Sequence, residues 1–264
     1  MLDIVYYNSS DLKITAVSGD MHSVNRVNFA LMHLFGYDFM PRFTKINEKA
    51  EKNLVSFNDP RDYQDHFVQP STKINKDLII SEWDNILRIL ASLAMKETTQ
   101  SIIIKKLSSY SKMNPTLKAL VEFDKIIMSI YMLNYIDDID LRRRVHRTLN
   151  RGESFHQLRS ALLQVSGKKY LGTSDIDFEI CNQCNKLLAC CIIYYNTSIL
   201  SALLQKAEAL KNYTLLTEIK QFSPVAWQHI NLLGNFTFST GKNILNIQSI
   251  IKFLLKNNET TSAL

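Results

Sequence analysis

The chain has 264 residues, of which 46% are hydrophobic and 21% are charged. A chain of this size and composition can bury a substantial core in one large or two modest domains, so an intrinsically disordered chain is excluded. The formal net charge of +6 favours a polyanionic partner without identifying one. No apolar stretch approaches the roughly 18 residues of a membrane span, and the first residues have no secretory pattern, so we expect a cytoplasmic protein.

Residues 1–43 predict alternating strand and helix. Asp11–Val17 alternates with period two, which is typical of a strand. Ser23 is then the expected N-cap of a helix that Gly36 ends. The apolar face of this helix comprises Val27, Ala30, Leu31, Leu34 and Phe35. Tyr37–Phe43 predicts a second short strand, in which a proline requires a position at an edge or an end.

Asp20 lies in the turn between the first strand and this helix. The carboxyl end of a strand is where α/β proteins expose ligand-binding residues, so Asp20 is a candidate site residue. An aspartate that only supports the chain reversal accounts for the local sequence equally well.

Residues 44–148 predict an irregular connection followed by a helical region. Lys45–Asp77 has no sustained period and is expected to be a largely irregular surface segment. From Ser81 onward the apolar residues recur at helical spacing in four successive stripes. Asn114 and Pro115 open the third of these helices, and Asp138–Leu149 forms the fourth, with its arginines on the solvent side.

Residues 149–264 begin with a candidate helix that carries Glu153. Asn150 and Gly152 are expected to end the preceding helix near Leu149. A new amphipathic helix then has Phe155, Leu158, Leu162 and Val165 on one side and Glu153, Gln157, Ser160 and Gln164 on the other. Glu153 should therefore be exposed in a first helical turn. There it would complement the helix dipole by roughly 0.3–1 kcal/mol, which is the alternative to a role in a site.

The remainder of this part predicts mostly helix. Ile180–Leu210 is expected to be a long buried helix with Cys190 and Cys191 in the core. Ser223 should cap a short helix that has proline at its first position. Phe236–Phe238 is expected to form a final strand, and the chain from Asn257 onward is expected to be frayed. Cys181 and Cys184 form a single C-x-x-C without a second ligand pair, so we expect reduced thiols and no zinc.

Basic residues are concentrated around Glu153. They are Arg142, Arg143, Arg144, Arg147, Arg151, Arg159, Lys168 and Lys169. Lysine and arginine side chains displace counterions from nucleic-acid phosphates, so this cluster predicts phosphate contacts. A solvated helix face without a ligand is the alternative.

Four ordered motifs carry a family resemblance. Ser18–Leu31, followed by Phe35-Gly36 and Pro41-Arg42-Phe43, resembles a catalytic segment of transposases from replicative, cointegrate-forming transposons, the Tn-three family. Asp20, His22 and Asn25 match that segment, whereas Gly19, Met21 and Ser23 depart from its commonest form. Leu149–Ser154 is similar to the family's L-N-K-G-E-A, Tyr195–Thr197 to its W-N-T, and Ser223–Gly234 to its S-P-x-x-W-x-H-I-N-x-x-G.

The resemblance implies a helix-rich, mixed α/β fold. Residues 1–43 would be a partial ribonuclease H-like core, residues 44–148 the irregular connection with a helical insertion, and residues 149–264 the glutamate helix with a helical C-terminal region. It also implies a DDE-class active site, in which two aspartates and a glutamate hold two Mg²⁺ ions for DNA cleavage and strand transfer. Asp20 would be the second aspartate and Glu153 the glutamate, both catalytic and metal-binding. The DNA-binding residues would be His22, Asn25, Arg42, Arg143, Arg147, Arg151, Arg159, Lys168 and Lys169.

One catalytic member has no counterpart in this sequence. The family's first aspartate lies on a strand upstream of the matched segment, and neither Asp3 nor Asp11 lies in the right motif. Leu2–Tyr7 also has the pattern of an amphipathic element that begins upstream. We therefore expect a C-terminal transposase fragment that is inactive alone, with DNA and the N-terminal part of the enzyme as partners. The alternatives are a metal-independent helical DNA-binding or regulatory protein that uses the arginine cluster, and a helical interaction module.

Overall fold

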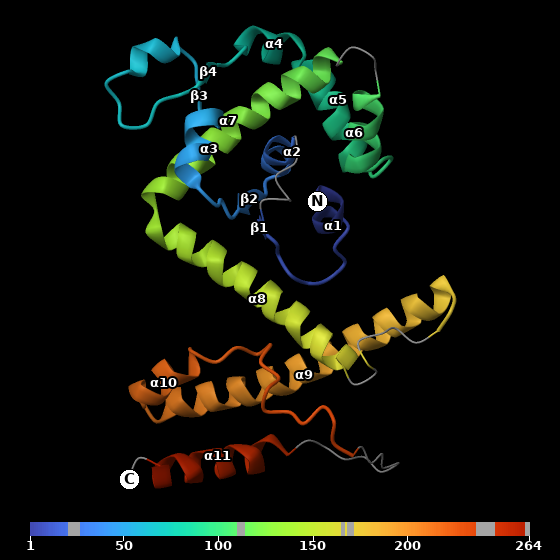
Figure 1. Ribbon diagram of the computed structural model, residues 1–264, viewed down its shortest axis with the longest axis vertical. Coiled ribbons are helices and arrows are strands. Elements are labelled where there is room, and N and C mark those ends of the chain that lie inside the picture. The colour runs from blue at the N-terminus through green and yellow to red at the C-terminus, as the bar shows by residue number, and fades with distance from the viewer. Residues whose placement is uncertain (21–26, 110–113, 165–166, 168–171, 236–245, 262–264) are drawn as a thin grey trace. The chain divides into compact units, whose positions relative to one another are not determined.

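The computed structural model describes residues 1–20, 27–109, 114–164, 167, 172–235 and 246–261, the last six of these by their backbone alone (Figure 1). The chain divides into two compact units, Met1–Leu149 and Asn150–Leu264. Helices predominate in both units and the described strands are few, which confirms the expectation of a helix-rich mixed fold.

The first unit contains two small parallel sheets among helices. The strands β1 (Ala16–Gly19) and β2 (Asp38–Pro41) form one sheet, and β3 (Val55–Ser56) and β4 (Thr72–Lys73) form the other. The helices are α1 (Leu2–Tyr6), α2 (Asn28–Leu34), α3 (Ile46–Asn53), α4 (Lys76–Ser81), α5 (Trp83–Ala94), α6 (Gln100–Ser108) and α7 (Pro115–Asp137), with a 3₁₀ turn at Pro60–Tyr63.

Helix α2 is the centre of this unit because it is buried on nearly all sides. Val27, Phe29, Ala30, Leu31 and Met32 are each at most 1% exposed. Helix α7 packs along α2, with Leu120 and Met132 in the same core (Figure 1). Gly36 ends α2 with φ +78°, and the N–H of Tyr37 donates to the carbonyl of Met32 at 2.9 Å. The predicted helix and its glycine stop are confirmed, whereas the predicted cap at Ser23 lies outside the described residues.

The first strand differs from its prediction. The alternating pattern predicted Asp11–Val17, but the strand is Ala16–Gly19, and Asp11 and Thr15 are exposed coil. Alternation marks a strand only where a partner is available. Here the partner is the four-residue β2, whose register runs from Ala16 opposite Asp38 to Gly19 opposite Pro41. The second strand and its terminal proline are as predicted.

The connection after β2 is more ordered than predicted. Lys45–Asp77 contains α3, β3, β4 and the 3₁₀ turn, and α4 begins within it. Ala50 and Leu54 are buried in the main core, and tertiary packing of this kind orders a polar segment despite its lack of period. Beyond it, Asn114 caps α7 by accepting from the N–H of Thr116 at 2.8 Å, as predicted.

Helix α8 (Ile139–Gln164) contradicts the predicted break at Asn150 and Gly152. One continuous helix contains both residues. A glycine inside a helix costs only about 1 kcal/mol, and Leu141, Val145 and Leu158 anchor the helix in buried packing. Asp138 caps its start, with Oδ1 accepting the N–H of Leu141 at 2.9 Å.

The second unit is built on α9 (Asp175–Ala209), which α10 (Tyr213–Ile219) and α11 (Ile247–Thr261) flank (Figure 1). The predicted burial of this helix is wrong. Leu187 is 65% and Tyr194 73% exposed, and Cys190 and Cys191 are exposed instead of lying in the core. Only a narrow side of α9, including Ala189, is buried. In the described part of the chain α9 is the one helix that is long and apolar enough to cross a membrane, which by itself is weak support for a span.

Two further predictions for this unit fail. Ser223–Ile230 forms turns and no helix, although Ser223 Oγ does accept the N–H of Val225 at 3.3 Å. Residues 257–261, predicted to be frayed, continue helix α11, whose Ile251 is buried and which packs on α9; the last three residues of the predicted frayed segment lie outside the described residues. The predicted strand Phe236–Phe238 and the basic residues Lys168 and Lys169 lie outside the described residues.

Candidate active site

Asp20 directly follows β1, as predicted. It is exposed at the carboxyl end of the strand. The parallel register pairs Gly19 with Pro41, and the N–H of Arg42 donates to the carbonyl of Gly19 at 2.8 Å. Asp20 and Arg42 thus each follow a strand at the same edge of the sheet. Of the other residues in this motif, His22 and Asn25 lie outside the described residues.

This edge of the sheet is hydrogen-bonded to α7. The hydroxyl of Tyr131 donates to the carbonyl of Pro41 at 2.7 Å, and burial raises the pKa of Tyr131, which keeps the donor protonated. The ring of Phe29 on α2 and the ring of Phe39 on β2 meet edge to face with centroids 4.8 Å apart. The position of Gly19 and of the residue after it is therefore set by the core.

Asp124 of α7, which the sequence did not single out, accepts hydrogen bonds from the start of α2, the helix that follows Asp20. It is 8% exposed on α7 and accepts the N–H of Ala30 at 2.9 Å. Burial raises the pKa of Asp124 to about 7, although backbone N–H groups of Ala30, Phe29 and Val27 pull it down. An acceptor from another helix thus caps α2, and the sequence offers no local sign of it.

Glu153 lies well inside α8, about three turns from its nearer end. The alternative of a glutamate in a first helical turn is therefore wrong, since the dipole effect fades within that turn. The predicted faces are confirmed for the described residues: Glu153, Gln157 and Ser160 are exposed, whereas Leu158 is fully buried. Val165, the last member of the predicted apolar face, lies outside the described residues. Phe155 and Leu162 pack beside Leu158 against Ala189 of α9.

Arg159 joins α8 to α9. Its Nε donates to Oδ1 of Asn185 at 2.9 Å, and an Nη donates to Asn182. The amide of Asn185 in turn donates to the backbone carbonyl of Arg159 at 3.0 Å. This half-buried guanidinium therefore has a structural task within the second unit.

Of the other arginines in the predicted basic cluster on α8, Arg142 is half-buried and the rest are exposed. Arg143 and Arg147 are one turn apart in the first unit, and Arg151 follows in the second. Arg143 pairs with Asp140 at 3.2 Å, but an exposed pair of this kind is worth little and leaves the guanidinium accessible.

The two candidate carboxylates have the donor chemistry that Mg²⁺ prefers. Both are exposed, and carboxylate oxygen is a hard ligand suited to this cation. Asp20 belongs to the first unit and Glu153 to the second. Within the part of the chain that the structure describes, no three His, Cys, Asp or Glu side chains gather as a metal site. The chain therefore supplies two suitable oxygen donors.

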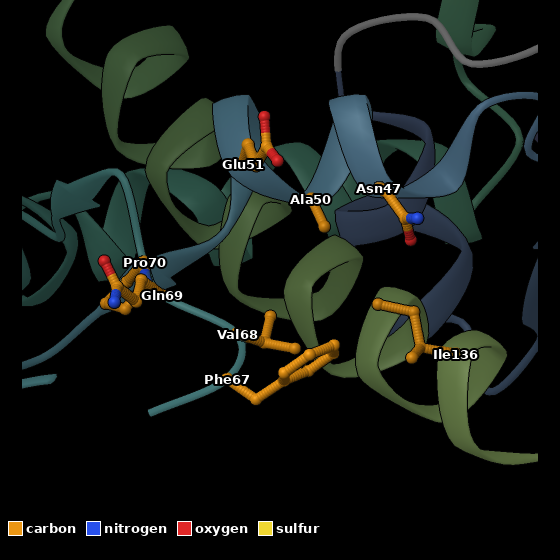
Figure 2. Close-up of a pocket in the computed structure, with 8 residues that line it drawn as sticks. All are labelled: Asn47, Ala50, Glu51, Phe67, Val68, Gln69, Pro70 and Ile136. Atoms are coloured by element: carbon orange, nitrogen blue, oxygen red, sulfur yellow. The ribbon is translucent and has the colours of Figure 1, made fainter. Parts of the chain in front are cut away.

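A pocket of about 580 Å³ lies elsewhere in the first unit (Figure 2). Figure 2 shows its lining: Asn47, Ala50 and Glu51 from α3, Ile136 from α7, and Phe67, Val68, Gln69 and Pro70 from the loop before β4. Glu51 is the one carboxylate among these lining residues, and the candidate site residues do not line the pocket.

Comparison with known proteins identifies the family. Residues 1–236 match the family model described as the Tn3 transposase DDE domain. The chain is 34% identical to the transposase for transposon Tn2501 of Escherichia coli over 248 residues, which are 90% of this chain and 24% of the relative. It is 30% identical to the transposase for transposon Tn501 of Pseudomonas aeruginosa over 246 residues, 92% of this chain and 24% of the relative.

The transposase for transposon Tn1546 of Enterococcus faecium is 29% identical over 244 residues, with the same coverage of 92% and 24%. The chain thus spans about a quarter of the length of the curated relatives it matches. The match nevertheless covers most of this chain and includes both Asp20 and Glu153. The chain belongs to the Tn3 transposase DDE domain family.

Proposed function

We propose that this chain is the part of a transposase catalytic domain that supplies the second and third carboxylates for DNA strand cleavage and transfer. The observation that carries the proposal is the match of residues 1–236, which include both Asp20 and Glu153, to the model of the Tn3 transposase DDE domain. Glu153 is exposed in the middle of the continuous helix α8. Asp20, at the carboxyl end of β1, would be its partner.

Asp20 and Glu153 would hold Mg²⁺ through their carboxylate oxygens. A bound pair of ions supplies activation of the attacking oxygen and stabilisation of the leaving oxygen. The protein's own contribution is orientation. The β1–β2 sheet fixes the backbone before Asp20, and the packing of Leu158 fixes the helix of Glu153. A ribonuclease H-like core, of which residues 1–43 would be part, remains our proposal for the complete domain. The division of the chain into three regions, with boundaries after residues 43 and 148, belongs to the same proposal.

DNA phosphates would be held by the basic side chains. Arg42 lies beside the Asp20 end of the sheet, and Arg143, Arg147 and Arg151 are exposed on α8. His22, Asn25, Lys168 and Lys169 complete the proposed set, and Arg159 would contribute from its place between α8 and α9. Each phosphate contact would make binding weaken as salt rises. We also propose that the protein is cytoplasmic.

A polypeptide of these 264 residues should be inactive alone. It carries Asp20 and Glu153 but no match to the first aspartate of the family's motif. With one of three carboxylates lacking, the ions would lose part of their ligand set. The upstream part of a transposase, supplied separately or joined to Met1, would restore the triad.

The test is Mg²⁺-dependent strand transfer on transposon-end DNA. We expect no product from the purified chain, and product when the upstream part is supplied. Efficient strand transfer by the chain alone would contradict the proposal of inactivity. Failure to form product with any upstream part, while the chain is folded and binds DNA, would contradict the proposed catalytic role.

A second candidate function is metal-independent DNA binding through the arginines. The exposure of Arg143 and Arg147 on successive turns of α8 favours it. In that case Glu153→Ala would leave function intact. Replacing Arg143 and Arg147 by alanine would weaken DNA binding and reduce its salt slope by about two.

A further inference from the structure

Asn196 of α9 holds a non-helical segment by three hydrogen bonds. The residue is 7% exposed, and its Nδ2 donates to the backbone carbonyls of Pro224 at 2.9 Å and Ala226 at 2.6 Å. Its Oδ1 lies 2.9 Å from Nε2 of His229. One side chain thus satisfies two carbonyls that no helix ladder serves, which is why Ser223–Ile230 turns instead of forming the predicted helix.

These contacts define both side-chain orientations. Only the NH₂ of an amide can donate, so the two carbonyl contacts assign Nδ2 and leave Oδ1 as an acceptor. An acceptor at Oδ1 requires a proton on Nε2 of His229. Both the neutral Nε2–H tautomer and the imidazolium have that proton, so the bond persists in either charge state.

The segment held in this way packs under the helix that carries Glu153. Val225 is buried with Leu158 of α8 and Ala189 of α9, and Trp227 and Phe155 pack against the same cluster. Phe155 and Leu158 are two and five positions after Glu153. A change in the position of Val225 or Trp227 is therefore transmitted to the turn of α8 on which Glu153 lies.

We propose that Asn196 and His229 are positioning residues for Glu153, acting through Val225 and Trp227. Their amide–imidazole pair fixes the segment against which the Glu153 turn of α8 rests. The inference rests on the proposed function, since it assumes that Glu153 must be oriented as a metal ligand. Arg159 and Asn185 join α8 to α9 nearby, but they do so without the 223–230 segment.

The first test is spectroscopic and uses the 264-residue chain. Long-range ¹H–¹⁵N correlation spectra should show His229 with a protonated Nε2 and, at high pH, an unprotonated Nδ1. The inverse tautomer at high pH, or a rapidly exchanging mixture, would overturn the amide–imidazole pair.

The second test separates positioning from general stability. Asn196→Asp keeps an acceptor for His229 but removes both protons that serve Pro224 and Ala226. Ile219→Ala is the matched control, because Ile219 is buried in the same unit on α10, away from the Leu158 cluster. We expect hydrogen exchange over residues 153–159 to be about tenfold faster in Asn196→Asp than in the control. Equal acceleration in both variants would overturn the inference.

The third test follows the reaction, with the upstream part supplied. Asn196→Asp and His229→Ala should raise the Mg²⁺ concentration for half-maximal strand transfer several-fold and leave DNA affinity unchanged, whereas Ile219→Ala should not move it. If Glu153→Gln retained full activity, the proposed function would fail. If Glu153→Gln were inactive but the Mg²⁺ midpoint of Asn196→Asp matched the control, only this inference would fail.

Discussion

Asp124→Asn tests the buried cap of α2, the helix that follows Asp20. The wild-type carboxylate accepts backbone N–H groups at the start of α2 while it is nearly excluded from water. Asparagine resembles the protonated acid in shape and in having one carbonyl acceptor, but it cannot ionise. The substitution therefore removes the charge and keeps most of the cap.

The magnitude follows from the pKa of Asp124, which burial raises from 3.8 to about 7 in the folded protein. At 1.36 kcal/mol for each pKa unit, the difference of about three units corresponds to roughly 4 kcal/mol. Because the folded pKa is the higher one, the folded state binds a proton that the unfolded state releases between these pH values. The contribution of this bound proton to the free energy of unfolding is fully present below pH 3.8 and is lost as the pH rises through about 7.

Urea unfolding of the wild type and of Asp124→Asn at a series of pH values measures this pH dependence of the free energy of unfolding. The difference between wild type and Asp124→Asn cancels the shared titration of other groups. We expect the two proteins to have similar free energies of unfolding near pH 4. At pH 8 the free energy of unfolding of the wild type should have fallen, relative to that of Asp124→Asn, by an amount that approaches a few kcal/mol. Asp124→Ala, which removes the acceptor, should be less stable than Asp124→Asn by about 1–3 kcal/mol at every pH. A constant difference between wild type and Asp124→Asn across this range would refute the reasoning.

Three further substitutions test the continuity and packing of α8 and the cap of α7. Gly152→Ala should stabilise the protein by about 0.5–1 kcal/mol in urea unfolding, because α8 is continuous there and, apart from the adjacent residues and the backbone of α8 itself, no described atom lies within 4 Å of the new methyl group; a destabilisation would indicate the break that the sequence predicted. Leu158→Ala should cost about 2–5 kcal/mol, since Leu158 is fully buried under the Glu153 helix, and a loss below 1 kcal/mol would contradict that packing. Asn114→Ala should cost about 1 kcal/mol through loss of the α7 cap, whereas Asn114→Asp should keep most of it, and equal losses would argue against capping.

Elements whose cause lies within a few residues were predictable from sequence. Gly36 ended α2 because a left-handed residue is needed there, and Asn114 with Pro115 started α7 because the side-chain acceptor and the fixed φ favour a first turn. Asp20 after a strand and Glu153 on a polar stripe were also read correctly, since helical and strand periodicity depend on neighbours in sequence.

The errors arise where distant residues decide. Burial of Leu141 and Leu158 keeps α8 continuous through Asn150 and Gly152. The cap of α2 by Asp124 joins residues about 94 positions apart. Asn196 prevents a helix at Ser223 by binding carbonyls from another element. Local sequence propensity does not predict such long-range contacts. The buried side of α9 likewise depends on which elements pack against it.

The most direct measurement of the central claim compares Glu153→Gln with Glu208→Gln in Mg²⁺-dependent strand transfer, with the upstream part of the transposase supplied. Both residues are exposed helical glutamates, so the control matches the loss of charge without touching the proposed site. Loss of a metal ligand worth about 4 kcal/mol would slow strand transfer on the order of a thousandfold in Glu153→Gln. Glu208→Gln should retain the wild-type rate. Equal rates for the two variants would contradict the assignment of Glu153 as a catalytic carboxylate.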